Sequence, residues 1–206
     1  MTIYLHKNDL PDDLAFGNSV AIDTETMGLN LARDRLCLVQ LSFGDGNAHL
    51  VQFSVGSDYA APNLRRLLSD PKILKIFHFG RFDIASIKAY MGVDCSPVYC
   101  TKIASRLVRT FTDRHSLKEL CRELLSVELS KQQQSSDWGA DTLSEEQKIY
   151  AANDVLYLHK LKEHLDPILE REGRMSLAQA CFDFLPARAE LDLAGWPEID
   201  IFAHNS

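Results

Sequence analysis

Short apolar runs bounded by turn residues alternate along this chain with segments that repeat apolar positions at helical spacing. The first runs, at 18–24, Leu36–Phe43 and Ala48–Phe53, predict three strands. Only residues 44–47, Gly-Asp-Gly-Asn, separate the second strand from the third, and this sequence is typical of a hairpin. The three strands are therefore expected to form an antiparallel meander.

Strands and helices alternate after this meander. Apolar runs predict strands at Ile73–Phe79 and Val98–Thr101, and capping-box spacing at Ser116 and Ser144 predicts that helices begin there. The expected helices are Pro62–Leu68, 80 to about 92, 101 to about 109, 116 onward, 144 to about 165, and Ala178–Leu193. This order predicts an α/β fold, a mixed sheet flanked by helices, in one domain over residues 1–206.

Composition narrows the class of protein. No apolar run approaches the ~20 residues of a membrane span, and the N-terminus lacks the layout of a signal peptide. The five cysteines are scattered without the spacing of metal ligands, so neither a zinc site nor a disulfide framework is expected. These features favour a cytoplasmic protein that does not contact membranes.

Charge is unevenly distributed. The net charge of −7 comes from residues 139–206, which hold 13 acidic residues against 6 Lys and Arg. The segment Thr101–Lys118 is basic instead, with five Lys or Arg and one Asp. A patch of this size could bind a few phosphates, whereas a long groove for duplex nucleic acid is not expected. The alternative for these basic residues is a solvated helix face.

Two carboxylates end the first strand. Asp23 and Glu25 are two residues apart, so their side chains are expected on one face of the strand while Thr24 faces the other way. Neighbouring carboxylates repel each other at a buried strand end unless a cation lies between them. Such oxygen ligands suit Mg²⁺ or Mn²⁺. The alternative is an acidic but solvated strand end.

Two further acids have positions that could join this pair. Asp83 follows the strand 73–79 in the first turn of a helix. The alternative role for its negative charge is a favourable interaction with the helix dipole and nothing more. Asp154 shares one helical stripe with Tyr150 and Leu158, on a side expected to face the core, where an unpaired carboxylate is costly. The four acids could converge on two metal ions, as a phosphodiester hydrolase requires.

These residues resemble the motifs of the DEDD 3′→5′ exonucleases, in the branch that carries a tyrosine. The motifs are Asp23-Thr-Glu25, His78-Phe-Gly-Arg-Phe-Asp83 and Tyr150-Ala-Ala-Asn-Asp154, and their order and spacing are similar to ribonuclease D. The resemblance implies a ribonuclease H-like (DnaQ-like) fold, two divalent ions held by the four acids, and a tyrosine that positions the attacking water. The catalytic residues would then be Asp23, Glu25, Asp83, Tyr150 and Asp154.

Two departures from ribonuclease D modify this expectation. Ribonuclease D usually continues into C-terminal helical domains, whereas this chain stops soon after the catalytic part at about 18–170. The second motif of ribonuclease D commonly begins His-Asn, whereas in this chain Phe79 follows His78. The short length and this motif look like nanoRNase C, a compact enzyme that cleaves dinucleotides. That resemblance implies short single-stranded RNA as substrate and a ring-like homo-oligomer, an octamer.

Residues beside the motifs are candidates for substrate binding by the same resemblance. They are Thr24, Met27, Gly28, Leu29, His78, Phe79 and Arg81. The alternatives are loop packing for Met27 and Leu29, a structural hydrogen bond for His78, and pairing of Arg81 with a nearby acid. The apolar C-terminal helix and tail, about 174–206, are expected to cover the core or to contact another subunit.

Three hypotheses about function follow. The first is a metal-dependent 3′→5′ exoribonuclease that hydrolyses short RNA, especially dinucleotides, to nucleoside 5′-monophosphates. The second is a general ribonuclease D-like exonuclease that trims longer RNA or degrades DNA, because nothing in the motifs reads the 2′-hydroxyl. The third is a non-catalytic nucleic-acid-binding module, and the presence of all four acids with Tyr150 argues against it.

Overall fold

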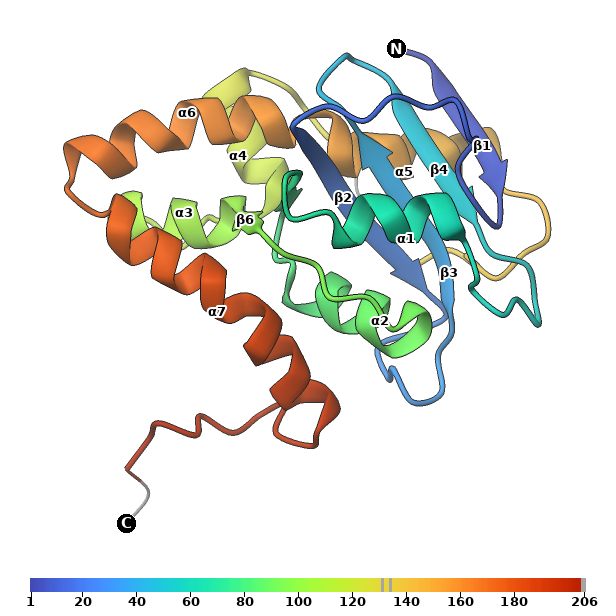
Figure 1. Cartoon of the computed structure of the whole chain (residues 1–206). Helices are drawn as coiled ribbons and strands as arrows, with labels where there is room; N and C mark the ends of the chain where they lie inside the picture. The colour runs from blue at the N-terminus through green and yellow to red at the C-terminus, as the bar shows by residue number, and fades with distance from the viewer. Residues whose placement is uncertain (131, 134, 205–206) are drawn as a thin grey trace.

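The computed structural model describes residues 1–130, 132–133 and 135–204, and within them the chain forms a six-stranded mixed sheet of order β1-β4-β3-β2-β5-β6 (Figure 1). The strands are β1 (Ile3–Lys7), β2 (Ser19–Thr26), β3 (Leu36–Ser42), β4 (Ala48–Gln52), β5 (Leu74–Phe77) and β6 (Val98–Cys100). β2, β3 and β4 form the expected antiparallel meander, whereas β1, β5 and β6 run parallel to their neighbours. The predicted α/β fold with a mixed sheet is confirmed.

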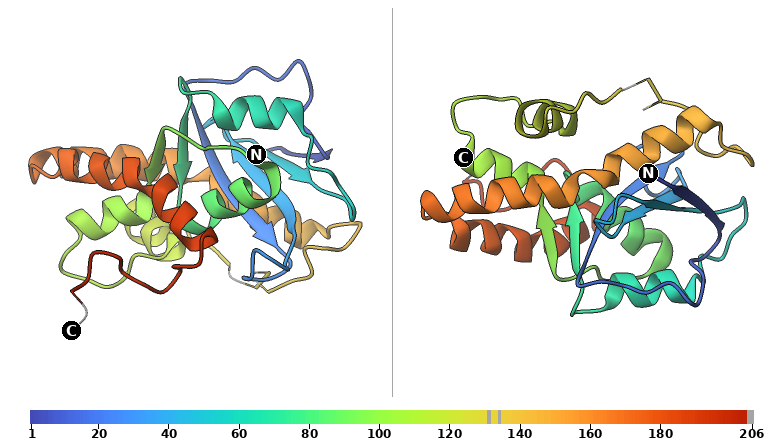
Figure 2. Two further views of the ribbon diagram at one scale, coloured as in Figure 1. Left: turned by 60° about the horizontal axis from the view of Figure 1, so that its bottom comes forward. Right: turned by 90° about the horizontal axis from the view of Figure 1, so that it is seen from above.

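Helices cover both faces of this sheet. They are α1 (Pro62–Ser69), α2 (Arg81–Met91), α3 (Thr101–Val108), α4 (Leu117–Leu125), α5 (Glu145–Leu156), α6 (Leu158–Arg171) and α7 (Met175–Leu193). α1 and α2 lie on one face and α5 crosses the opposite face, while α3, α4, α6 and α7 gather on the β5–β6 side (Figures 1 and 2). β2 therefore lies between α2 on one face of the sheet and α5 on the other.

β1 was not among the strands that the apolar pattern predicted. It is an edge strand that pairs with β4, and its Tyr4 and Leu5 remain 44% and 36% exposed. A strand that buries so little apolar surface has no continuous apolar run for a sequence to reveal. Its formation depends on pairing with residues more than 40 positions away, such as Ile3 with Ala48.

The prediction of one helix from 144 to about 165 was wrong in its continuity. α5 ends at Leu156, Tyr157 interrupts the helix, and α6 begins at Leu158. α5 packs on β2, β3 and β4, whereas α6 packs on α3 and α4, so the two segments follow different surfaces. Neither glycine nor proline marks the break, because tertiary packing imposes it.

The C-terminal helix packs on the body of the domain. The expected helix Ala178–Leu193 is present within α7, whose Ala178, Phe182 and Leu185 are buried. The ring of Phe182 lies 4.5 Å from that of Tyr99 on β6, centroid to centroid. The last two residues of the tail expected at 174–206 lie outside the described residues. None of the helices that the structure describes is both long and apolar enough to cross a membrane.

Candidate active site

The C-terminal end of β2 directs two carboxylates toward α5. Asp23 and Glu25 alternate onto the same face of the strand, and α5 crosses that face carrying Asp154. One carboxylate oxygen from each of the three residues lies within 4.8 Å of the other two. The strand period and the helical spacing together bring these acids to one point, as the sequence predicted.

Asp83 reaches the same strand end from the other layer. It lies in the first turn of α2, and its Oδ1 accepts a 2.7 Å hydrogen bond from the Thr24 hydroxyl. Thr24 faces opposite to Asp23 and Glu25 because side chains alternate along β2. Asp83 is outside the tight group of three, yet its charge is the strongest of those that raise the pKa of Asp23. The four acids therefore form one electrostatic unit.

Burial and mutual repulsion make these carboxylates resist ionisation. Burial first, and then the charges of Asp83, Asp154 and Glu25, raise the pKa of Asp23 well above its ordinary value. The same two causes raise the pKa of Glu25 to about 9 and that of Asp154 to about 7. Burial raises the pKa of Asp83 to about 7, opposed by the hydrogen bond from Thr24.

No lysine or arginine in the described part of the chain forms an ion pair with any of these four acids. Among the described residues, the negative charge of this site therefore has no matching positive charge. Carboxylate oxygens at this spacing are the ligands that Mg²⁺ and Mn²⁺ prefer. The residues present fit divalent cations, which would also relieve the repulsion that raises the pKa values of Asp23, Glu25 and Asp154.

Gln40 and Tyr150 complete the surroundings of the acids. Gln40 lies opposite Asp23 in the β2–β3 ladder, and its Nε2 donates to Asp23 Oδ2 at 3.3 Å. Tyr150 is one turn before Asp154, and its ring packs on Trp138 with centroids 6.0 Å apart. Burial, followed by the charge of Asp154, raises the pKa of the Tyr150 hydroxyl. That hydroxyl therefore keeps its proton at neutral pH.

A cavity of about 870 Å³ opens above these residues. Its walls include the catalytic candidates Asp23, Glu25, Asp83, Tyr150 and Asp154 and the substrate candidates Thr24, Met27, Gly28, Leu29, His78 and Phe79. Lys102 and Lys118, two members of the basic segment that the sequence offered for phosphate binding, also line it, together with Ser116. The alternative for the segment, a solvated helix face, therefore does not describe these two lysines fully.

The loop after β2 holds two apolar side chains at the rim of this cavity. A Cβ on Gly28 would lie 2.4 Å from Asp34 Oδ2, so only glycine allows the loop to approach so closely. Asp34 fixes the loop further by accepting from the Asn30 amide at 3.0 Å. Met27 is 52% exposed and Leu29 is 86% exposed. The loop is therefore held in place while its apolar side chains stay accessible.

Arg81 lies elsewhere. Its Nε and Nη2 donate to the two carboxylate oxygens of Asp192 at 2.6 and 2.7 Å, and Nη2 also donates to the Pro197 carbonyl. It is absent from the described lining of the acidic cavity. The alternative expected for Arg81 was pairing with a nearby acid instead of substrate, and the structure shows that pairing. The ion pair joins the start of α2 to the end of α7.

His78 is hydrogen-bonded at the wall of the cavity. Its Nδ1 lies 2.8 Å from Thr101 Oγ1, at the start of α3. Burial lowers the pKa of His78 to about 3, and the nearby Lys102 charge contributes to that fall. The imidazole is therefore neutral at physiological pH and joins the end of β5 to α3.

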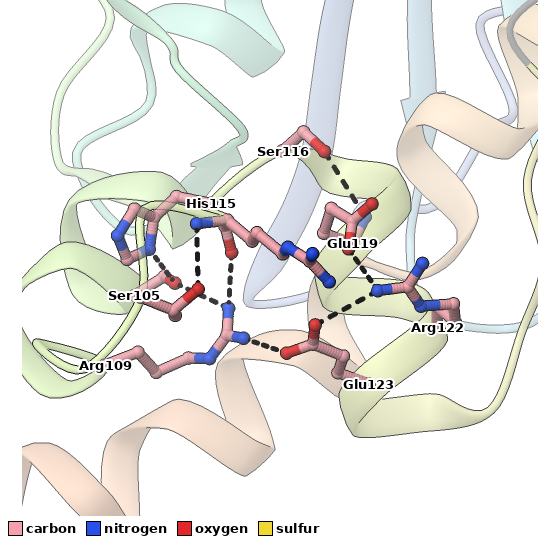
Figure 3. Close-up of polar contacts among 9 residues, drawn as sticks. Ser105, Arg109, His115, Ser116, Glu119, Arg122 and Glu123 are labelled. Atoms are coloured by element: carbon pink, nitrogen blue, oxygen red, sulfur yellow. Dashed lines mark hydrogen bonds and ion pairs between the residues drawn. The ribbon is translucent and has the colours of Figure 1, made fainter.

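A charge network holds the segment between α3 and α4 beside the cavity. Its labelled members in Figure 3 are Ser105, Arg109, His115, Ser116, Glu119, Arg122 and Glu123. Arg109 is almost fully buried, pairs with Glu123, and donates to the Arg114 carbonyl at 2.8 Å. Arg122 bridges Glu123 and Glu119. This balanced network positions Ser116 and the start of α4 at the rim.

Comparison with solved structures supports this reading of the site. The chain is 59% identical to Brucella melitensis NrnC bound to pGG, with a TM-score of 0.95 over 100% of both chains. It is 58% identical to the same protein with bound Mg²⁺, with a TM-score of 0.94 over 100% of both chains. Exonucleases of this family use two divalent metal ions, in agreement with the acidic cluster described above.

Sequence comparison points the same way. The ribonuclease D of Gluconacetobacter diazotrophicus is 35% identical over 76% of this chain, which spans only about 39% of the length of that relative. Residues 6–170 match the 3′–5′ exonuclease family. The expected resemblance to ribonuclease D-like exonucleases and to NrnC is confirmed. The chain therefore belongs to the 3′–5′ exonuclease family and is a hydrolase of the ribonuclease D and NrnC type.

Proposed function

We propose that this exonuclease acts on short RNA, with dinucleotides as its preferred substrates, and releases nucleoside 5′-monophosphates. The observation that carries the proposal is the match to NrnC over the full length of both chains, including a structure of NrnC with the short ligand pGG. The cavity above the acids, about 870 Å³, has the size of sites that enclose small ligands rather than long polymers.

We assign metal binding to Asp23, Glu25, Asp83 and Asp154. Two divalent ions, Mg²⁺ or Mn²⁺, would supply an activated water and stabilise the departing 3′-oxygen. Asp23 is central, because it lies in the group of three and also senses the charge of Asp83. Gln40 holds one oxygen of Asp23 and so fixes the rotamer of that carboxylate.

Tyr150 orients the attacking water in this proposal. Its hydroxyl retains its proton and lies beside Asp154, so it can donate a hydrogen bond at the point where the water must sit. Trp138 packs on the tyrosine ring and limits its movement. Lys102 and Lys118 line the same cavity and offer positive charge to the substrate phosphates.

The test compares hydrolysis of a 5′-labelled RNA dinucleotide, a 7-mer and a 20-mer in Mn²⁺ and in EDTA. The proposal expects metal-dependent cleavage with kcat/KM strongly biased to the dinucleotide. Equal kcat/KM at all three lengths would contradict the length preference while leaving the exonuclease activity in place. A parallel DNA dinucleotide measures how far the 2′-hydroxyl matters.

A second candidate is a general ribonuclease D-like enzyme that trims longer RNA or degrades DNA. The observation in its favour is the identity of 34–35% to curated ribonucleases D. These relatives are more than twice as long as the matched region, so their substrates do not transfer directly. The length series above separates the two candidates, because this one predicts comparable or better cleavage of the 20-mer.

We also propose that the chain works in the cytoplasm as a homo-oligomer, an octamer by the resemblance to nanoRNase C. The tail after α7 leaves Trp196 44%, Ile199 50% and Phe202 76% exposed. Exposed apolar side chains in one segment are typical of protein interfaces. Deleting residues 194–206 should lower the mass measured by light scattering. An unchanged mass would exclude the tail as a subunit contact.

A further inference from the structure

The residue after His78 adopts a backbone conformation that its side chain does not favour. Phe79 has a φ of 66°, in the left-handed region where glycine and asparagine are found most often. It lies in the short turn between the end of β5 at Phe77 and the start of α2 at Arg81. An aromatic residue with this φ is an outlier that requires a reason.

The turn itself explains the conformation but not the phenylalanine. A Cβ on Gly80 would lie 2.5 Å from Phe77 Cβ, so the chain must pass close to β5 at that point. The left-handed residue directly precedes this close approach, and asparagine would adopt that conformation with less strain. The Phe79 ring is 47% exposed, so burial in the core does not account for it either.

The surroundings of the ring indicate what it is for. Phe79 lines the cavity above the four acids, and Lys102 Nζ lies 4.2 Å from the centroid of its ring. An ammonium over one face of an aromatic ring is attracted to it and fixes its orientation. The exposed remainder of the ring is therefore presented to the cavity as a flat apolar surface.

We propose that Phe79 is the stacking surface for a base of the substrate, with its ring held in place by the Lys102 ammonium. Every base has a π-face, so such a surface binds without reading sequence. A dinucleotide makes few other contacts, so it depends on this one more than a long RNA does. The proposal rests on the short-RNA function proposed above and names the residue that confers the length preference.

The decisive variant is Phe79→Asn, which removes the ring and relieves the backbone. Its melting temperature should equal or exceed that of the unchanged protein, because asparagine accepts the left-handed conformation. Its kcat/KM for the dinucleotide should fall about 5- to 150-fold, the range expected for one stacked base, with a smaller fall for the 20-mer. Phe79→Tyr keeps the stacking face and should retain most activity.

A substrate variant isolates the stacking contact from general damage. Abasic dinucleotides, with the base removed at the 5′ or the 3′ position, should react poorly with the unchanged enzyme. For one of the two positions, Phe79→Asn should add little further loss, because the contact is already absent. Fully additive losses at both positions would overturn the proposal. The control is Phe111→Asn, which removes an 81% exposed phenylalanine that is not among the residues lining the cavity.

The outcomes separate this inference from the function on which it rests. An unchanged protein that cleaves no RNA dinucleotide contradicts the short-RNA function. An active enzyme whose Phe79→Asn variant keeps its dinucleotide kcat/KM overturns the role of Phe79 alone. A loss of activity accompanied by a fall in melting temperature for Phe79→Asn also overturns it, because the ring would then be structural.

Discussion

Two clusters of charged side chains lie near the cavity, and they differ in how their charges are balanced. In the network between α3 and α4, Arg109 and Arg122 alternate with Glu119 and Glu123, so each charge has an opposite partner. At the end of β2 the carboxylates face one another with no such partner among the described residues, and their pKa values rise. Balanced charge stabilises the fold, whereas unbalanced charge reserves a place for cations.

The largest effect that would test this contrast is on catalysis. Asp154→Asn keeps the size of the side chain and removes one charge from the acidic cluster. We expect kcat to fall on the order of 10³-fold in Mn²⁺, because metal ions contribute several kcal/mol to phosphodiester cleavage. Titration with Mn²⁺ should show weaker binding. The control Glu145→Gln, on the same helix but solvent-exposed, should leave both quantities unchanged.

The balanced network should respond in stability rather than in chemistry. Arg109→Met leaves Glu123 without its main partner and loses the hydrogen bond to the Arg114 carbonyl. We expect the free energy of unfolding in urea to fall by about 1–3 kcal/mol, because the buried Arg109 loses its hydrogen bonds while Glu123 is partly exposed and keeps Arg122. Arg171→Met breaks an exposed pair with Glu172 and should change it by less than about 0.5 kcal/mol. Equal effects would remove the distinction.

The pH dependence of the stability of the metal-free protein tests the effect of the unpaired carboxylates. Folding raises the pKa values of Asp83 and Asp154 to about 7 and that of Glu25 to about 9. Above about pH 4 the unfolded chain releases these protons while the folded chain retains them, so stability falls as pH rises toward 9. Urea unfolding in EDTA between pH 5 and 9 should show this fall. A flat profile would contradict it.

The same experiment has a matched variant. Asp154→Asn should be more stable than the unchanged protein in EDTA at pH 8, by about 1–3 kcal/mol, and less sensitive to pH. In excess Mg²⁺ the order should reverse, because the ion stabilises only the chain that binds it. A variant that is less stable in both conditions would show that Asp154 supports the fold by itself.

The smallest expected effect concerns Arg81. Asp192→Asn weakens its bidentate pair with Arg81 at a site that is partly exposed to solvent. We expect the free energy of unfolding to fall by about 1 kcal/mol and the KM for the dinucleotide to stay within about twofold. A large rise in KM with unchanged stability would instead indicate that Arg81 contributes to substrate binding.

The sequence predicted the parts of this molecule that local rules determine. The meander, the strand end with Asp23 and Glu25, and the helical stripe through Tyr150 and Asp154 all follow from periods of two and 3.6 residues. β1 escaped prediction because its pairing with β4 is long-range and its side chains stay half exposed. The helix break at Tyr157 was not predicted, because it arises where α5 and α6 pack on two different surfaces.

At the site, too, the contacts that the sequence did not predict are long-range ones. Gln40 contacts Asp23 only because the β2–β3 register places them opposite each other. Lys102 of α3 meets Phe79 of the turn between β5 and α2, a contact that no spacing along the chain encodes. The motifs identified the acids, and the fold was needed to find what surrounds them.

The alternation of side chains along β2 has one more consequence. Asp23 and Glu25 face α5 while Thr24 ties Asp83 of α2 to the same few residues. Ions bound here would take ligands from the sheet and from the helical layers on both of its sides. Metal binding would therefore couple the two helical layers and raise the cooperativity of unfolding. Amide hydrogen exchange should slow in α2 and α5 together, although the two helices lie on opposite faces of the sheet.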